Sequence, residues 1–505
     1  MSRVHSELWH LPQRAGVPMA PAGRRAAVIG GGIAGVAAAT LLCERGVQVT
    51  LLEREPTLGG RAGGFEHVLA TGETVHMERG FHAFFRQYYN LRALLRRIDP
   101  ELALLTALPD YPILGPSGML QSFRDLPKRT PFQVLALAWR SPYLRLADLV
   151  HVNGRAAFEM LCFDGLRTYQ RYDRRSAADY LDSLSFPSAA RRMLFNVFSH
   201  SFFNPESELS AAELLMMFHF YFTGNAEGLV FDVVRRPLTT AIWQPFETWL
   251  RQRNASVLTS SEVERVERQP AGGLVVHHSR GTSEVDDVVL ALDVAALQRV
   301  VTQSAAFGAL HAQVEALGLT RPFAVWRLWL DRPLRADRAA FAGTTGVGLL
   351  DNISCYERFQ DESAAWARQH GGSVVELHAY AVPHENEAAI KADLLAGLRM
   401  FYPETVAARV LHDCFLLRQD CPAFPPGSHA VRPTVATRLP NVALAGDFVA
   451  MPFPCALMER AAASGFLAAN TLLAQYGVAA EPLRSVAARG LFSFPGHAHE
   501  PRAAL

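Results

Sequence analysis

The chain has 505 residues, half of them hydrophobic, and only 19% are charged. Average soluble domains carry roughly a quarter charged residues, so this composition excludes a disordered protein and provides ample material for a large core. The 49 basic and 48 acidic residues leave a net charge of +1, and no run of like charge offers a face for nucleic acid.

The apolar excess raises the possibility of a membrane protein. The two longest charge-free runs, 26–43 and 461–480, are interrupted by glycines or polar residues and lack aromatic belts at both ends. Residues 1–24 contain no apolar signal core. We therefore expect a cytoplasmic chain with no signal peptide and no transmembrane helix, for which peripheral contact with the inner face of the membrane stays open.

The first predicted unit is a strand, a glycine turn, a helix and a second strand. Arg25–Ile29 is an apolar run typical of a buried parallel strand, while 36–45 favours an alanine-rich helix and 47–52 a second strand. The turn Gly30-Gly31-Gly32-Ile33-Ala34-Gly35 fits GxGxxG. This complete strand–turn–helix–strand context predicts a dinucleotide site in a Rossmann-type α/β domain.

Each part of this unit has a physical role. Gly30 permits the tight turn, Gly32 lets the backbone approach a pyrophosphate, and Gly35 lets the helix pack closely on the strand. The helix N-terminus offers free N–H groups to the phosphates. Glu53, which closes the second strand, can accept hydrogen bonds from a ribose diol. The remaining expected contacts in this unit are Ile33, Ala34 and Arg54.

A second glycine pair follows in Leu58-Gly59-Gly60-Arg61. Gly60 lets another loop press against the same pyrophosphate, whose charge Arg61 can neutralise. This doublet resembles that of the flavoprotein superfamily of amine oxidases and carotenoid desaturases, which implies FAD rather than NAD. Cys421 precedes a proline pair, loosely as in cysteine-tethered amine oxidases, but the spacing differs, and we expect FAD to be held non-covalently.

Two later segments extend the resemblance. Residues 249–267 favour a helix end, a turn and a strand, where Val263 is the candidate to meet the adenine through its backbone. Residues 442–447 form a buried strand ending in Gly446 and Asp447, the family's aspartate for the ribityl–phosphate. Met458 then opens a helix that runs to about residue 476, although Arg460 stands where the family usually has glycine.

The flavin signals therefore fall at three separated places, which predicts a discontinuous FAD-binding domain with an inserted α+β substrate domain. We assign the FAD-binding domain to 25–110, 240–300 and 430–480. The substrate-binding domain takes 111–239 and 301–429, between an N-terminal tail (1–24) and a C-terminal tail (481–505). The six cysteines show no CxxC pair or Cys/His zinc spacing, so we expect buried, reduced thiols and no metal.

An unusual aromatic run follows the predicted strand Thr74–Glu78. In the family this stretch lies against the flavin ring, which implies that Gly80 approaches it closely and that Phe81 contacts it. The expected aromatic substrate wall comprises Phe81, Phe84, Phe85, Tyr88 and Tyr89. Ordinary aromatic packing at the start of a core helix explains the run equally well.

The resemblance narrows at this run. Residues 80–97, 191–203 and 213–231 resemble the bacterial carotenoid ring-aromatising enzymes, the φ-ring or isorenieratene synthases, and the likeness extends over roughly 26–480. It implies that four hydrogens are removed from a β-ionone ring of β- or γ-carotene and that one methyl group undergoes a 1,2-shift. Aromatic faces suit the cation-like intermediate, and His82 is the candidate base, although a structural histidine fits as well.

Other readings stay open. Residues 214–222 have three possible interpretations, namely a buried substrate-domain helix, a channel lining or a membrane-entry surface. Residues 130–149 could rest on a bilayer as an amphipathic segment. The alternative functions are an amine oxidase, whose usual flavin-side lysine could only be Lys128 or Lys391, a carotenoid or phytoene desaturase, and a flavin-binding scaffold without turnover. Residues 485–505 read as an irregular tail with no role.

Overall fold

A computed structural model describes most of the chain. The predicted amphipathic segment 130–149, apart from positions 136 and 139, and most of 191–203 lie outside the described residues. Those described are 15–124, 152–185, 203–270 and 272–492 except positions 109, 226 and 228, with 9–10, 127, 136, 139 and 191.

A five-stranded parallel sheet forms the core of one half of the molecule. Its order is β11-β3-β2-β15-β21, and every neighbouring pair is parallel. The strands are short apolar runs because both faces of the sheet are covered. They come from three separated stretches of the chain, which confirms the predicted α/β fold class. The bounds are β2 Arg25–Ile29, β3 Gln48–Leu52, β11 Ser256–Leu258, β15 Asp287–Leu290 and β21 Val442–Leu444.

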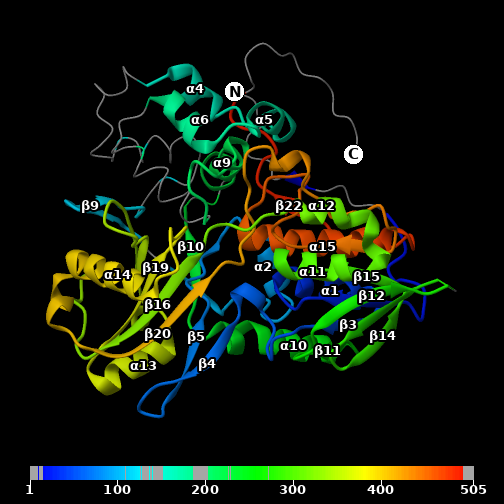
Figure 1. Cartoon of the computed structure of the whole chain (residues 1–505), viewed down its shortest axis with the longest axis horizontal. Helices are drawn as coiled ribbons and strands as arrows, with labels where there is room; N and C mark the ends of the chain where they lie inside the picture. The colour runs from blue at the N-terminus through cyan, green and yellow to red at the C-terminus, as the bar shows by residue number, and fades with distance from the viewer. Residues whose placement is uncertain are drawn as a thin grey trace.

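Helices cover this sheet (Figure 1). Helix α1 (Ile33–Glu44) connects β2 to β3 and begins three residues earlier than expected, because Ile33 to Gly35 are already helical. It packs against α15 (Leu457–Ala474), where a Cβ on Gly465 would lie 2.2 Å from the Ala34 carbonyl oxygen. Small residues thus let the first and last long helices approach closely. The sheet's other helices include α10 Gln244–Arg251 and α11 Val294–Gln303.

The single strand predicted within 249–267 is instead two strands in different sheets. Ser260, with φ +49°, turns the chain away from β11. The chain then enters an antiparallel sheet of β12 (Val263–Arg268), β13 (Leu274–His278) and β14 (Gly281–Val285). Val257, Val263 and Val266 are all buried. Because one strand or two strands would bury them equally, their spacing does not distinguish the two arrangements.

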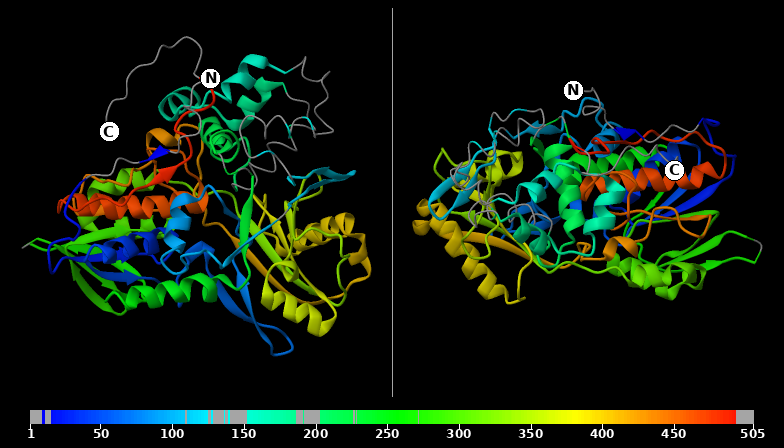
Figure 2. Two further views of the ribbon diagram at one scale, coloured as in Figure 1. Left: turned by 180° about the vertical axis from the view of Figure 1, so that it is seen from behind. Right: turned by 90° about the horizontal axis from the view of Figure 1, so that it is seen from above.

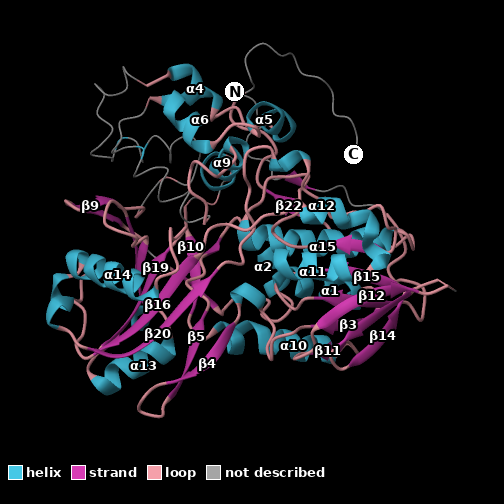
Figure 3. Cartoon of the chain, in the orientation of Figure 1, coloured by secondary structure: helices cyan, strands magenta, loops and turns pink. Residues whose placement is uncertain are grey.

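A seven-stranded sheet, ordered β20-β16-β19-β18-β17-β8-β9, dominates the other half (Figure 3). Its strands fall within the two segments predicted for the substrate domain. Helices α13 (Asp361–His370) and α14 (Glu387–Phe401) accompany it. The strand bounds are β8 Ile113–Gly115, β9 Gly118–Gln121, β16 Phe323–Leu330, β17 Phe341–Thr344, β18 Asn352–Cys355, β19 Ser373–Ala379 and β20 Val410–Arg418.

Smaller sheets link the two halves. Strand β10 (Phe231–Val234) pairs with β6 (Phe84–Phe85) and with β7 (Leu105–Ala107), so a strand of the predicted substrate segment joins strands of the predicted FAD segment. The hairpin of β4 (Gly64–Val68) and β5 (Thr74–Glu78) leads into the aromatic run. These pairings place that run between the two large sheets.

A helical layer sits over the junction between the sheets (Figure 2). It contains α4 (Gly154–Glu159), α5 (Gly165–Tyr172), α6 (Ala177–Leu184) and α9 (Ala211–Phe218), and α9 continues as a π-helix to Thr223. Side-chain oxygens cap the first turn of each of these four α-helices. The α9 region is buried, as the first of the three readings of 214–222 predicted.

The chain ends pack against each other in part. Strand β22 (Arg484–Ser485), at the edge of the predicted irregular tail, pairs antiparallel with β1 (Trp9–His10). Leu483 and Val486 on either side are fully buried, so this stretch belongs to the core rather than to a loose tail. In the part of the chain that the structure describes, no helix combines the length and apolarity needed to cross a membrane.

Candidate functional site

The glycines of the turn between β2 and α1 have two different roles, backbone packing and access for a ligand. A Cβ on Gly30 (φ +107°) would lie 2.2 Å from the Ala291 carbonyl oxygen, and a Cβ on Gly35 would lie 1.8 Å from the Gly30 carbonyl oxygen. These two glycines are required by backbone packing. A Cβ on Gly32 would meet nothing closer than Gly60 Cα at 3.9 Å, so Gly32 faces open space that a ligand can enter.

Helix α1 begins directly at this open space. In contrast with the four helices above the junction, no side chain among the described residues caps its N-terminus, which follows Gly32. Its first N–H groups, including those of Ile33 and Ala34, have no intrahelical acceptor. Together with the helix dipole they form an anion-binding end suited to phosphate.

The second glycine loop lies directly on the first. The Gly59 N–H donates to the Gly31 carbonyl at 2.9 Å, and a Cβ on Gly60 would lie 3.1 Å from Gly32 Cα. Arg61 extends from this loop, and its guanidinium meets the Asp447 carboxylate at 2.5 Å. Arg61, which was predicted to contact the pyrophosphate, and Asp447, which was predicted to contact the ribityl–phosphate, therefore contact each other directly.

Glu53 directly follows β3 and contacts the glycine turn. Its carboxylate accepts hydrogen bonds from the Gly31 N–H at 2.7 Å and from the Glu55 N–H at 2.9 Å. Burial raises the pKa of Glu53, although these two hydrogen bonds act in the opposite direction. The neighbouring Arg54 lies 3.7 Å from Asp293, which caps α11. Both residues border the space beside Gly32.

The predicted cofactor residues line one cavity. Gly35 lies behind the wall, in keeping with its packing role. The predicted residues that line the cavity are Gly30, Gly32, Ile33, Ala34, Glu53, Arg54, Gly60, Arg61, Gly80, Phe81, Val263, Gly446, Asp447 and Met458.

The residues of this half fit FAD. The uncapped helix end and the open space at Gly32 suit a pyrophosphate, Arg61 supplies positive charge, and the Glu53 carboxylate suits a ribose diol. When bound, FAD supplies a two-electron acceptor that takes up hydride.

The other half of the cavity is walled by aromatic rings. Phe81 stacks on Phe341 with ring centroids 4.5 Å apart, and Phe231 meets Phe81 edge-on at 5.9 Å. Tyr111 stacks on Phe123 at 4.5 Å and lies 4.7 Å from Phe231. Phe85, Tyr88 and Tyr221 continue the wall.

Two of the predicted wall residues lie elsewhere. Phe84 and Phe85 are neighbours in strand β6, so their side chains point to opposite sides, and Phe84 is buried away from the cavity. Tyr89 opens helix α2 (Tyr89–Leu95), and its hydroxyl donates to Glu227 at 3.4 Å. Neither is among the described residues that line the cavity.

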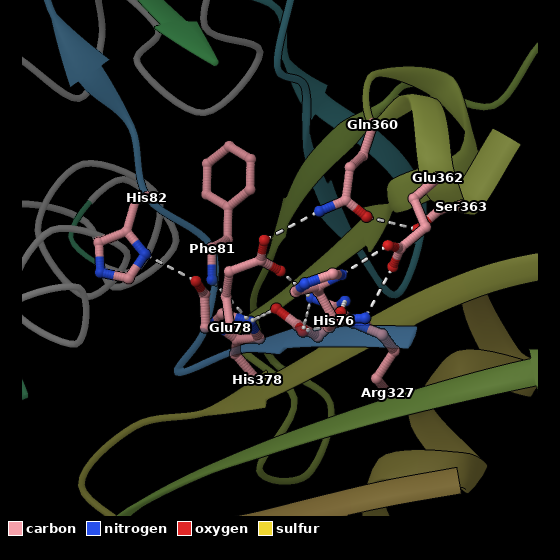
Figure 4. Close-up of polar contacts among 11 residues, drawn as sticks. His76, Glu78, Phe81, His82, Arg327, Gln360, Glu362, Ser363 and His378 are labelled. Atoms are coloured by element: carbon pink, nitrogen blue, oxygen red, sulfur yellow. Dashed lines mark hydrogen bonds and ion pairs between the residues drawn. The ribbon is translucent and has the colours of Figure 1, made fainter. Parts of the chain in front are cut away.

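His82, the predicted base, lines the cavity beside Gly80. Its Nδ1–H donates to the Gly80 carbonyl at 2.7 Å, which leaves Nε2 as the acceptor atom of the ring (Figure 4). Burial lowers the pKa of His82 to about 4. The neutral ring is therefore strongly favoured, and protonation during a reaction would be costly.

A buried charge network includes Arg327, Glu78 and His378 (Figure 4). Arg327 on β16 contacts the carboxylates of Glu78 at 2.8 Å and Glu376 at 2.7 Å. The other oxygen of Glu376 lies 2.7 Å from Nε2 of His378. Burial would raise the pKa of Glu376, but Arg327 and His378 together outweigh burial and hold that pKa below its usual range. A Cβ on Gly80 would approach His378 Cε1 to 3.2 Å.

A second buried cluster accounts for Arg460. Its guanidinium contacts the Glu213 carboxylate of α9 at 3.0 Å, and Arg432 contacts the same carboxylate. Arg460 also donates to the Cys455 carbonyl at 2.9 Å and to the Asp447 carbonyl at 3.2 Å. The arginine at the family's usual glycine position therefore ties the Asp447 loop to the helical layer.

Lys391 and Lys128 were the candidates for an amine oxidase lysine, and Cys421 was the candidate for covalent flavin attachment. Lys391 on α14 pairs with Glu387 at 2.8 Å and with Asp413 at 2.9 Å, outside the lining of the cavity. Lys128 lies outside the described residues. Cys421 does line the cavity, where burial raises the pKa of its thiol to about 12.

Sequence reasoning missed several lining residues, including Tyr111, Phe231, Phe341, His378 and Tyr380. Except for Phe231, which ends the segment 213–231, they lie outside the quoted segments, and the strands that carry or adjoin these residues meet only in the fold. One signal was available, since a charged residue inside a wholly apolar strand needs a buried partner. Arg327 lies within FAVWRLWL, and the alternation in VVELHAY puts Glu376 and His378 on one face.

The chain resembles known flavoproteins in both sequence and fold. The model of the flavin-containing amine oxidoreductase family matches residues 33–473. The chain is 49% identical to a carotenoid phi-ring synthase of Streptomyces griseus, covering 95% of each chain. A carotenoid phi-ring synthase of Chlorobaculum tepidum is 28% identical, over 93% of this chain and 91% of that one. Putrescine oxidase bound to putrescine shares the fold, with a TM-score of 0.63 at 15% identity, over 89% of this chain and 99% of that one.

Proposed function

The chain belongs to the flavin-containing amine oxidoreductase family, and within it to the carotenoid phi-ring synthases, and on this premise we propose that it aromatises a carotenoid β-ionone ring. It is an FAD-dependent oxidoreductase. The proposed reaction removes four hydrogens from the ring in two two-electron oxidations. One methyl group of the geminal pair moves to the neighbouring carbon.

The observation that carries this proposal is the aromatic wall in the same cavity as the dinucleotide turn. A methyl shift passes through a positively charged ring carbon, which aromatic faces stabilise by about 0.5–2 kcal/mol each and which water would trap. Phe81, Phe231 and Phe341 pack against one another in the lining of this cavity and would give such a ring an aromatic contact surface. Their apolar surface also matches the hydrocarbon substrate.

We propose the following roles in holding FAD. The pyrophosphate lies at Gly32 and the first N–H groups of α1, with Arg61 as its counter-charge. Glu53 accepts the ribose hydroxyls, and Asp447 accepts from the ribityl chain once Arg61 turns to the phosphates. Gly80 gives the isoalloxazine ring its close approach. The remaining proposed contacts are Gly30, Ile33, Ala34, Arg54, Gly60, Phe81, Val263, Gly446 and Met458.

We propose β- or γ-carotene as the substrate, taken up during peripheral contact with the cytoplasmic face of the membrane. The exposed apolar side chains of Met119 (65% exposed) and Trp139 (83% exposed) support this contact. Met119 lies on β9, shortly before Phe123 of the cavity wall. The double variant Met119→Ala, Trp139→Ala should float less with lipid vesicles, whereas Val68→Ala on β4 should float normally. Equal flotation of all three proteins would contradict the proposed surface.

The reaction is tested with purified, FAD-loaded protein and β-carotene in detergent micelles. The expected product carries an aromatic ring and lacks four hydrogens per converted ring, as mass and absorption spectra report. Expression in a β-carotene-producing bacterium gives the same readout in cells. An unchanged pigment profile with FAD demonstrably bound would refute ring aromatisation. Peroxide production from amines would instead favour an amine oxidase.

A further inference from the structure

A line of hydrogen bonds leads from the cavity wall to the buried charge network. The Tyr380 hydroxyl, just beyond the end of β19, lies 2.9 Å from Nδ1 of His378 and accepts from Nδ2 of Asn352 at 3.0 Å. Nε2 of His378 lies 2.7 Å from Glu376, which Arg327 holds from the other side. Tyr380, His378 and Asn352 all line the cavity, whereas Glu376 and Arg327 lie behind it.

The chemistry of the partners sets the direction of each proton. An ionised carboxylate only accepts, so Nε2–H of His378 donates to Glu376. The Phe81 N–H also lies 3.4 Å from Nε2, but the shorter carboxylate contact decides the tautomer. Nδ1 is then the acceptor, and the Tyr380 hydroxyl donates to it. The second lone pair of the Tyr380 oxygen remains available to the cavity.

This arrangement is better suited to accept a proton than His82. A proton added to Nδ1 of His378 makes an imidazolium that the Glu376 carboxylate stabilises directly, as in other carboxylate–histidine pairs. The Nδ1–H of His82 has only the Gly80 carbonyl as a partner, and burial lowers the pKa of that ring to about 4. The two histidines flank Gly80, so both are within reach of the same region.

We propose that Tyr380 and His378 form the base for both deprotonations of the ring, an inference that rests on the proposed function. In each oxidation one ring C–H bond breaks and its hydrogen leaves with both electrons as hydride, for which FAD, when bound, would be the acceptor. A second C–H bond then breaks, and its electrons form the new carbon–carbon double bond. Its proton moves to the Tyr380 oxygen while the hydroxyl proton passes to Nδ1 of His378, and from there to solvent.

The second oxidation differs by one rearrangement. The methyl group moves with its bonding electrons to the neighbouring cationic carbon before the proton leaves. Between the two oxidations an external two-electron acceptor, a quinone or dioxygen, restores the oxidised flavin. Glu376 is a positioning residue, since it acts through the tautomer of His378, and Arg327 in turn holds Glu376 ionised.

The test compares four single variants of the FAD-loaded protein. His378→Gln retains a donor to Glu376 but lacks a basic nitrogen, and Tyr380→Phe removes only the hydroxyl. His82→Gln tests the competing base. His76→Gln is the matched control, because His76 pairs with Glu362 at the far end of the same network, outside the cavity lining.

We expect kcat for aromatic product to fall about 100-fold or more in His378→Gln and at least 10-fold in Tyr380→Phe. KM and FAD content should stay unchanged, His82→Gln should lose less kcat than His378→Gln, and His76→Gln should stay within about 3-fold of the parent. A binding readout complements the rates. An N-alkyl piperidinium that mimics the ring cation donates its N–H to the Tyr380 oxygen, so its Kd should weaken at least 10-fold in Tyr380→Phe, as titration of the FAD absorbance reports.

Several outcomes overturn the relay while leaving the function intact. If the parent forms the aromatic carotenoid and only His82→Gln loses activity, His82 is the base. If His76→Gln falls as far as His378→Gln, the network is merely structural. Should His378→Gln fail to fold, normal turnover by Tyr380→Phe still refutes the relay. Absence of aromatic product from the parent protein refutes the proposed function instead.

Discussion

Gly32 and Gly35 lie three residues apart in one motif, yet their substitution by alanine should give opposite results. A Cβ on Gly35 would lie 1.8 Å from a backbone oxygen, and since ordinary contact begins near 3.4 Å, α1 would have to move by about 1.6 Å. Backbone atoms cannot rotate away, so Gly35→Ala should cost several kcal/mol and lower the unfolding midpoint even without FAD.

Gly32→Ala should leave the apoprotein intact, because its φ of −72° suits alanine and its Cβ meets no atom within 3.9 Å. The methyl group would instead occupy the space of the pyrophosphate. Losing one charge-assisted hydrogen bond to an α1 N–H costs about 1.5–3 kcal/mol, which is roughly a 10- to 150-fold weaker Kd for FAD. Urea unfolding of the apoprotein and titration of flavin fluorescence measure the two effects. Normal FAD affinity in Gly32→Ala would refute the proposed position of the pyrophosphate.

Three further predictions follow from the site. Burial raises the pKa of the Cys421 thiol to about 12, so the neutral thiol should not attach flavin, and acid precipitation should leave all yellow colour in the supernatant. Arg432 and Arg460 outweigh burial and hold the pKa of Glu213 well below its unfolded value of 4.5. The stability this provides is present above about pH 4.5 and is lost on further acidification. Glu213→Gln should cost about 3–5 kcal/mol in urea unfolding at neutral pH and should lose this acid sensitivity, and equal curves for both proteins would contradict the ion pairs. Phe231→Leu should keep FAD but form aromatic product roughly 2- to 30-fold more slowly, as chromatography of the pigments measures.

The local parts of the fold were predictable from the sequence. The β2–turn–α1–β3 unit spans fewer than thirty residues, and its turn glycines, buried strands and closing Glu53 act through neighbours in the chain. The three separated flavin segments followed from the same kind of local signal. Even here the start of α1 was placed three residues late, because glycine at the first turn does not prevent helical geometry.

The aromatic half of the cavity depends on pairings that no local pattern contains. Phe231 reaches the site because β10 pairs with β6, and Phe341 because β17 pairs in parallel with β8. Within β6 the register decides which of Phe84 and Phe85 faces the cavity, and two adjacent phenylalanines give no indication of it. Tyr380 lies beyond the end of β19 and reaches the site with that strand.

The close packing of α1 against α15 also constrains how the protein is made. Helix α1 is almost entirely buried, yet its partner begins at Leu457, more than 400 residues after α1 ends. At translation rates of about 5–20 residues per second, the apolar first helix leaves the ribosome roughly 20–80 s before its partner exists. The nucleotide fold can therefore close only after synthesis is nearly complete. Until then the nascent chain exposes a surface that invites aggregation, and a chaperone that shields it should raise the yield of active protein.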